Sequence, residues 1–268
     1  MKLILLSVFI FFSFTAKAFS KIKSNATEIN LYSGDKSGTF FIKATEICKK
    51  FNENASKKGL NYICKVKESK GSLENLYHIK KDANSFSIIK SPEFYQHVSN
   101  IDYDFNEIKI VRKTHDEFLT VLVNKRSQIQ SLTDLNNKRI NIGYIGSSSR
   151  IITEKYLNDF KIKPVNIFAY GAGESFKQME NNNLDAWVYF NGHPNPGYSK
   201  ILNDDQFDII SLSKSETANF VAIGNFFKEN ILDLKSLYGI NRSIQTISSE
   251  TFLATNDTTS VEILNLMK

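Results

Sequence analysis

The sequence has few of the residues on which metal sites and catalytic centres depend. It contains two cysteines and four histidines, and the histidines are far apart with no zinc-ligand spacing. No Gly-x-Ser-x-Gly elbow and no Gly-Lys-Ser/Thr phosphate loop occurs. We therefore predict that the protein is not an enzyme and uses no metal or cofactor. The cluster His115-Asp116-Glu117 is predicted to be a solvated turn.

Long apolar runs are absent after the first residues. The run at 3–14 is twelve residues long, too short to span a bilayer as a stable helix. Lys2 precedes it and Ala16-Lys17-Ala18 follows it, as in a secretory signal with its A-x-A cleavage site. We predict that residues 1–18 are a signal peptide and that the mature chain is soluble and periplasmic. An uncleaved anchor is the alternative.

Neither sign of charge dominates the chain. Lysine and arginine number 34 against 28 acidic residues, a formal net charge of +6. Removal of Lys2 and Lys17 with the signal lowers this charge to +4. The basic residues are scattered, whereas nucleic-acid binding needs a concentrated basic face. We predict no nucleic-acid partner, and the mild positive charge favours anionic ligands.

Both cysteines lie in the predicted mature chain. Cys48 falls on the apolar face of a predicted helix, and Cys64 points inward from the strand that follows. In an oxidising compartment two such thiols on adjacent elements can form a disulfide. A pair of buried free thiols fits the pattern equally well, so both alternatives stay open.

Strand-like and helix-like segments alternate along most of the chain, which predicts an α/β fold with parallel sheets covered by helices. The predicted strands are 28–32, 60–66, 85–90, 139–142, 165–168 and 184–189, and the predicted helices are 39–51, 72–80, 151–160 and 174–181. Two further apolar strands, 118–124 and 251–256, each lead to a polar turn. We predict that these two strands connect two lobes, with 25–123 and 245–268 in lobe one and 124–244 in lobe two.

A glycine-flanked triple serine is the most informative segment. Ser147, Ser148 and Ser149 follow the apolar strand 139–142 and precede the helix 151–160. The start of a helix offers free backbone N–H groups and partial positive charge, and the hydroxyls add donors. The segment therefore predicts an anion-binding site, without distinguishing carboxylate from phosphate or sulfate.

Four other polar loops follow predicted strands, where α/β sheets bind ligands. Their candidate ligand-binding residues are Ser37, Thr39, Phe40, Phe41, Ser72, Lys90, Ser91, Asn191 and His193. A single serine or threonine before a helix is usually only an N-cap. Five such loops spread over both halves of the chain favour a binding cleft.

Several stretches together resemble the TAXI-type solute receptors of TRAP transporters, which have the two-lobed type II periplasmic-binding-protein fold. They are SGDKSGTFF (33–41), KGSLENL (70–76), SLTDLNNKRINIG (131–143), GSSSR (146–150), GAGESFKQMENNNLDAWVYFNGHP (171–194) and the late strand around TFLATND. The resemblance implies an extracytoplasmic protein that captures a small organic anion between two lobes joined by two hinge strands. The anion would be a dicarboxylate, keto acid or acidic amino acid, delivered to a TRAP-type membrane permease.

The resemblance also assigns roles to residues of this sequence. Ser147, Ser148 and Ser149 would bind a carboxylate of the ligand. Thr39 and Ser91 would donate hydrogen bonds to the ligand from the other lobe. Phe40 and Phe41 would contact its apolar part. Phe40 and Phe41 replace the family's usual tyrosines, and Lys90 replaces a glutamine. Lys90 would pair with a second carboxylate or point to solvent.

The chain also differs from the family at its end and leaves a second function open. It stops at Lys268, whereas members commonly continue for some tens of residues, so it resembles a shortened receptor. The alternative function is a non-transporting interaction protein, sensor or surface antigen on the same fold.

Overall fold

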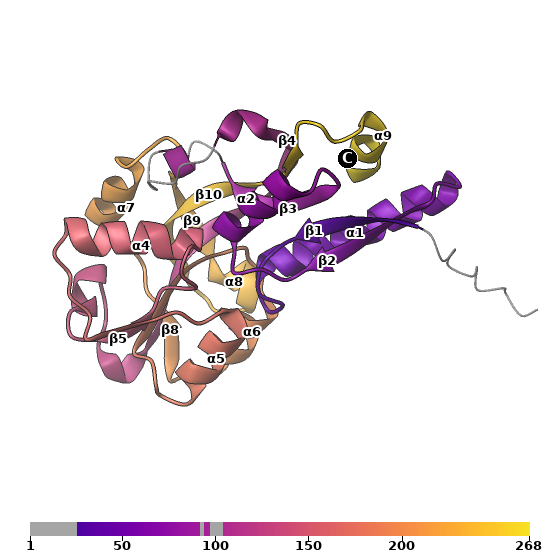
Figure 1. Ribbon diagram of the computed structural model, residues 1–268. Coiled ribbons are helices and arrows are strands. Elements are labelled where there is room, and N and C mark those ends of the chain that lie inside the picture. Colours follow the sequence, from indigo (N-terminus) through magenta and orange to yellow (C-terminus); the bar gives the residue numbers. More distant parts are fainter. Residues whose placement is uncertain (1–25, 92–93, 97–103) are drawn as a thin grey trace, which may run out of the picture.

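The computed structural model describes residues 26–91, 94–96 and 104–268 and shows a two-lobed α/β fold (Figure 1). The predicted signal peptide, 1–18, lies outside the described residues. Lobe one is built around β1, β2 and β3, and lobe two is built around β5, β6 and β7. The fold class predicted from the alternating pattern is therefore confirmed.

A single curled sheet runs through both lobes. Its order is β2-β1-β3-β10-β4-β7-β5-β6, with β8 paired to β4 and β9 paired to β10. The strands are β1 (Thr27–Tyr32), β2 (Tyr62–Lys67), β3 (Ser85–Lys90), β4 (Ile108–Asn124), β5 (Arg139–Asn141), β6 (Asn166–Phe168), β7 (Ala186–Asn191), β8 (Phe207–Ile209), β9 (Lys228–Asp233) and β10 (Ser243–Asn256). Within each lobe the neighbours β1–β2, β1–β3, β5–β6 and β5–β7 are parallel.

The two longest strands join the lobes. β4 has 17 residues and β10 has 14, and they pair antiparallel along the middle of the sheet. The second half of β4, from Phe118, pairs with β7 of lobe two, whereas β10 from Thr251 pairs with β3 of lobe one. These halves are the strands 118–124 and 251–256 that the sequence singled out as connections.

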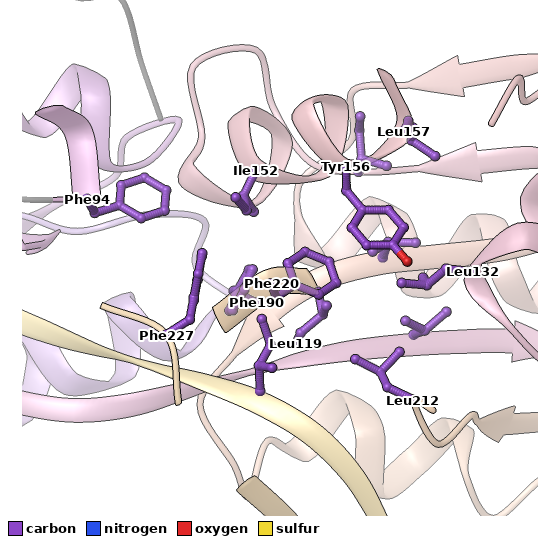
Figure 2. Close-up of a cluster of buried hydrophobic side chains, with 14 of the residues drawn as sticks. Phe94, Leu119, Leu132, Ile152, Tyr156, Leu157, Phe190, Leu212, Phe220 and Phe227 are labelled. Carbon is purple, nitrogen blue, oxygen red and sulfur yellow. The ribbon is translucent and has the colours of Figure 1, made fainter. Parts of the chain in front are cut away.

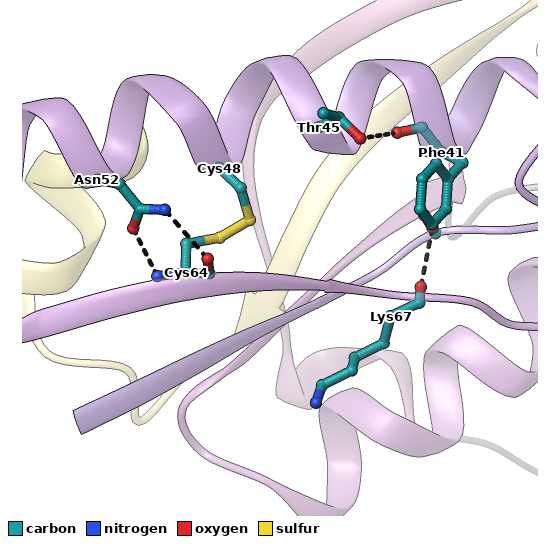
Figure 3. The surroundings of a disulfide bond; sticks show 7 residues. Phe41, Thr45, Cys48, Asn52, Cys64 and Lys67 are labelled. Atoms are coloured by element: carbon teal, nitrogen blue, oxygen red, sulfur yellow. Dashed lines mark hydrogen bonds between the residues drawn. A yellow bond between two sulfur atoms is a disulfide. The ribbon is translucent and has the colours of Figure 1, made fainter. Parts of the chain in front are cut away.

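Lobe one is a sheet with helices on both faces. Its helices are α1 (Thr39–Lys57), α2 (Ser72–Lys81) and α9 (Val261–Met267). The apolar face of α1 packs with α9 over β1, β2 and β3 in one buried cluster. A disulfide joins Cys48 of α1 to Cys64 of β2, and Asn52 on the next turn bonds both backbone groups of Cys64 (Figure 3). Of the two alternatives for the cysteines, the structure has the disulfide.

Lobe two is a three-layer sandwich. Its helices are α4 (Ser148–Asp159), α5 (Ala172–Glu180), α6 (Pro196–Ile201), α7 (Lys214–Val221) and α8 (Leu234–Tyr238), with two short 3-10 helices, η2 (Lys125–Ser127) and η3 (Leu132–Leu135). A third 3-10 helix, η1 (Phe105–Glu107), precedes β4. The helices α4 and α7 cover one face, where Tyr156 stacks on Phe220 (Figure 2). The helices α5, α6 and α8 cover the other face around Trp187.

The structure overturns one local prediction. His115, Asp116 and Glu117 lie in the middle of β4 and do not form a solvated turn. The side chains of His115 and Glu117 are only 10 % and 6 % exposed. The sequence was misleading because a strand segment of polar residues has the composition of a turn, and only its pairing with β10 shows that it is part of the sheet.

Candidate functional site

Three helices begin at one cleft between the lobes. The helices α1, α2 and α4 follow the carboxyl ends of β1, β2 and β5, and the first turn of each lines the cleft. Seven of the residues singled out in the sequence meet there: Thr39, Phe40, Ser72, Ser147, Ser148, Ser149 and Asn191. Three convergent helix N-termini concentrate partial positive charge and free N–H groups in this space.

The three serines of the run have different roles. Ser147 is the N-cap of α4, and its hydroxyl accepts a hydrogen bond from the Arg150 N–H at 3.2 Å. The Ser149 hydroxyl accepts from the N–H of Phe190 on β7 at 3.0 Å. The Ser148 hydroxyl has no hydrogen-bond partner among the described residues, although the residue is only 6 % exposed. Ser148 is therefore the hydroxyl of this run that makes no hydrogen bond to the described part of the protein, whereas those of Ser147 and Ser149 act as acceptors.

This difference predicts unequal effects of two neighbouring substitutions on stability. Ser149→Ala leaves a buried backbone N–H without an acceptor, so we expect it to lower the free energy of unfolding by about 1–3 kcal/mol. Ser148→Ala removes a hydroxyl that bonds nothing, and we expect a change within about 0.5 kcal/mol. Urea unfolding of both variants measures the difference. Equal stabilities would show that the Ser149–Phe190 bond does not stabilise the fold.

Other predicted residues line the cleft but already have partners. The Thr39 hydroxyl donates to the carbonyl of Gly192 at 3.0 Å, so it links α1 to the end of β7. The Asn191 amide donates to the Tyr198 hydroxyl at 2.9 Å. Phe40 packs edge-on against the ring of His115. These residues shape the cleft, and Thr39 connects its two sides.

Five predicted site residues lie elsewhere. Ser37 lines a separate hollow beside α5 and α6, and Ser91 lines a hollow on the other side of β10. Phe41 is half-buried on α1 and does not line the cleft. His193 is half-buried; its Nε2 lies 2.9 Å from the Thr120 hydroxyl and its Nδ1 contacts Tyr238. Burial lowers the pKa of His193 to about 4, so the imidazole is neutral.

Lys90, the fifth of these, is wholly buried and pairs with a carboxylate of the protein itself. Its Nζ lies 2.8 Å from Glu117 Oε2 and 4.9 Å from the centre of the Phe190 ring. Burial lowers the pKa of Lys90 and raises the pKa of Glu117, while their mutual attraction opposes both shifts. Lys90 therefore neither points to solvent nor faces the cleft, and Glu117 lines the cleft in its place.

Asp35 is a second carboxylate in the cleft and bridges the two lobes. Its Oδ1 accepts from the Ser37 N–H at 2.9 Å and from the Gly173 N–H at 3.4 Å. Its Oδ2 accepts from the Tyr144 hydroxyl at 3.4 Å. Because Gly173 is in the first turn of α5, Asp35 places a negative charge at the N-terminus of that helix. The α5 end is therefore already occupied by the protein's own carboxylate.

Two tyrosines complete the wall on the lobe-two side. Tyr144 follows β5, and Tyr189 lies on β7 with its ring against Gly143. Burial and the nearby carboxylates of Glu117 and Asp35 raise the pKa of Tyr189, so its hydroxyl stays protonated. Gly143 has φ +94°, and a Cβ there would lie 2.7 Å from the Tyr189 ring. Only glycine fits this position without displacing Tyr189.

The cleft is narrow in this conformation. Its volume is about 30 Å³, which is room for a water molecule or two but not for a metabolite. The lobes touch directly around it, through the Thr39–Gly192 and Asp35–Gly173 hydrogen bonds. A ligand can therefore enter only when the lobes separate, with β4 and β10 as the connections that must bend.

Besides three glycines, six residues that line the cleft were not predicted as site residues from the sequence: Asp35, Lys70, Glu117, Tyr144, Tyr189 and Phe190. A signal existed for two of them. Asp35 is the acidic residue of the loop between β1 and α1, and Tyr144 lies in the loop after β5, between Gly143 and Gly146. Glu117 could not be found, because its segment was interpreted as a turn.

A comparison with protein families gives the chain its classification. The sequence model of the NMT1-like family matches residues 31–267. The chain belongs to the NMT1-like family. No group of histidine, cysteine, aspartate or glutamate in the described part of this NMT1-like chain could hold a metal ion. Within the same residues, no helix combines the length and apolarity needed to cross a bilayer.

Solved structures with a similar fold include a substrate-binding protein, a periplasmic transporter and a regulatory domain. An R. palustris protein with adipate is 13% identical, with 90% of this chain and 80% of that chain covered and a TM-score of 0.57. A structure described as a periplasmic transporter is 11% identical over 91% and 81% of the two chains, also with a TM-score of 0.57. The substrate-binding protein of an amino acid ABC transporter is 13% identical over 90% and 89%, with a TM-score of 0.52. At these identities the likeness concerns the fold.

Proposed function

We propose that this NMT1-like protein is a periplasmic solute-binding protein of the TAXI type. It captures a small organic anion (a dicarboxylate, keto acid or acidic amino acid) and delivers it to a TRAP-type membrane permease. In this proposal the signal peptide, 1–18, directs export. Lobe one comprises 25–123 with 245–268, and lobe two comprises 124–244.

The observation that carries the proposal is the convergence of three helix N-termini on one interlobe cleft. Backbone N–H groups at α1, α2 and α4 suit a carboxylate, and the unpartnered Ser148 hydroxyl adds a donor. Phe40 and Phe190 supply the apolar wall. The R. palustris protein of similar fold is described with adipate, a dicarboxylate, which supports an anionic ligand for a cleft of this fold.

Thermal unfolding of the chain from Phe19 to Lys268 tests the proposal. The ligands are dicarboxylates, 2-oxo acids and acidic amino acids. Binding to the native state alone should stabilise it by about 2.7 kcal/mol at a hundredfold excess over the dissociation constant. Ser148→Ala should weaken this stabilisation while leaving the ligand-free protein as stable as the wild type. A folded protein with no shift against the whole set would contradict the proposal and favour a non-transporting interaction protein.

A further inference from the structure

Glu117 is the charged group that the hinge strand β4 presents to the cleft. Its Oε2 is bound to Lys90, whose Nζ is fully buried and does not line the cleft. A ligand therefore meets a carboxylate at this point and not the lysine behind it. The ion pair keeps Glu117 in place and prevents its side chain from turning into solvent, because Lys90 would then be left buried without a counter-ion.

His115, two residues earlier on β4, lies beside Glu117. Its Nδ1 lies 3.0 Å from the Thr251 hydroxyl and 3.1 Å from the Thr114 hydroxyl. Its other ring nitrogen, Nε2, faces Glu117. Burial lowers the pKa of His115 to about 3, so the ring is neutral.

Glu117 Oε1 accepts no hydrogen bond from the described residues, since Lys90 binds Oε2 and His115 Nε2 lies 3.9 Å from Oε1. A buried acceptor without a donor is costly, and a ligand group that donates to Oε1 relieves that cost. A second carboxylate from a ligand cannot do this, because an ionised carboxylate has no proton to donate. Lys70 is the one basic side chain among the residues lining the cleft.

We propose that Glu117 binds the protonated amino group of an amino acid whose carboxylate lies at the N-terminus of α4. This inference rests on the proposed function and narrows its ligand class: the cleft selects an amino acid over the 2-oxo acid or the dicarboxylate of the same carbon skeleton. Glu117 is then the specificity-determining residue, and Lys90 is a positioning residue that holds it.

Calorimetric titration with matched ligands tests the inference. Each set has one carbon skeleton in three forms, for example L-glutamate, 2-oxoglutarate and glutarate, and a second set is L-alanine, pyruvate and propionate. We expect the amino member of a set to bind at least ~10-fold more tightly than the other two, as a charge-assisted hydrogen bond provides. Tighter binding of the oxo acid or the dicarboxylate would overturn the inference and leave the proposed function intact. Binding of no member would overturn both.

Two variants separate selectivity from affinity. Glu117→Gln should reduce the preference for the amino member by ~10-fold or more, because a neutral amide attracts an ammonium group less than a carboxylate does. Ser148→Ala, the matched control, should weaken all three members of a set equally, because they share the carboxylate. An unchanged preference in folded Glu117→Gln would contradict the role of Glu117. Should Glu117→Gln fail to fold, the wild-type ranking of the matched ligands decides the question.

Discussion

Lys90→Met is expected to lower the free energy of unfolding by about 3–5 kcal/mol, the cost of breaking a buried ion pair by removing one partner. The Lys90 side chain is fully buried and that of Glu117 is 6 % exposed, so the remaining carboxylate gains almost no hydration. The substitution also removes the ammonium group from the face of the Phe190 ring. Chemical denaturation at neutral pH measures the loss.

Two further variants test the cause of this loss. Lys113→Met serves as the control, because Lys113 pairs with Asp116 and Glu250 but is 43 % exposed, and we expect a loss below about 1 kcal/mol. The double variant Lys90→Met/Glu117→Gln has no unpaired charge and should recover a large part of the stability. A double variant as unstable as Lys90→Met would mean that packing, and not the uncompensated carboxylate, is responsible.

Removal of the disulfide is the second large expected effect. Replacing Cys48 and Cys64 together by serine should lower the free energy of unfolding by about 3 kcal/mol, because the bond closes a loop of sequence separation 16 and restricts the unfolded chain. Asn52 still bonds the backbone of residue 64 from the same face of α1, so the native contact between helix and strand is retained (Figure 3). Urea unfolding compares the variant with the oxidised wild type.

The reductant dithiothreitol provides the control for this experiment. It should lower the stability of the wild type to that of the double serine variant and should not affect the variant. Mass spectrometry after alkylation of the unfolded protein counts the free thiols. Two free thiols in the untreated wild type, with a stability that the reductant does not change, would contradict the bond.

Local sequence patterns predicted many elements up to β7, but α6, β8, α7, β9 and α8 were not predicted. β3 was predicted with its observed ends, and α1, α2 and α4 begin at or within three residues of the predicted starts. These elements carry clear periodicity and begin at glycine or serine, so neighbouring residues specify them. The first half of β4 was missed because its charged residues alternate with apolar ones only weakly, and its strand pairing is with β10, far along the chain.

The candidate site was predicted in part, because local sequence patterns also locate the loops at the ends of strands. Loops at strand ends meet at one edge of a parallel sheet, so Thr39, Ser72 and Ser148 could be grouped without knowing any distance. Ser91 and His193 also follow strands, but one faces the other side of β10 and the other points into the lobe-two core. The place of a residue after a strand therefore predicts at which edge of the sheet the residue lies, but it does not predict in which direction the side chain points.

By itself the sequence determined the α/β class and the helix starts that supply N–H groups to the cleft, because both depend on residues close together in the chain. Only the tertiary structure decided the charge of the cleft. Lys90 and Glu117 lie on β3 and β4, and they meet because β10 pairs with both strands. That register is set by long-range packing, and it makes Lys90 the buried counter-ion of Glu117 instead of a ligand-binding cation.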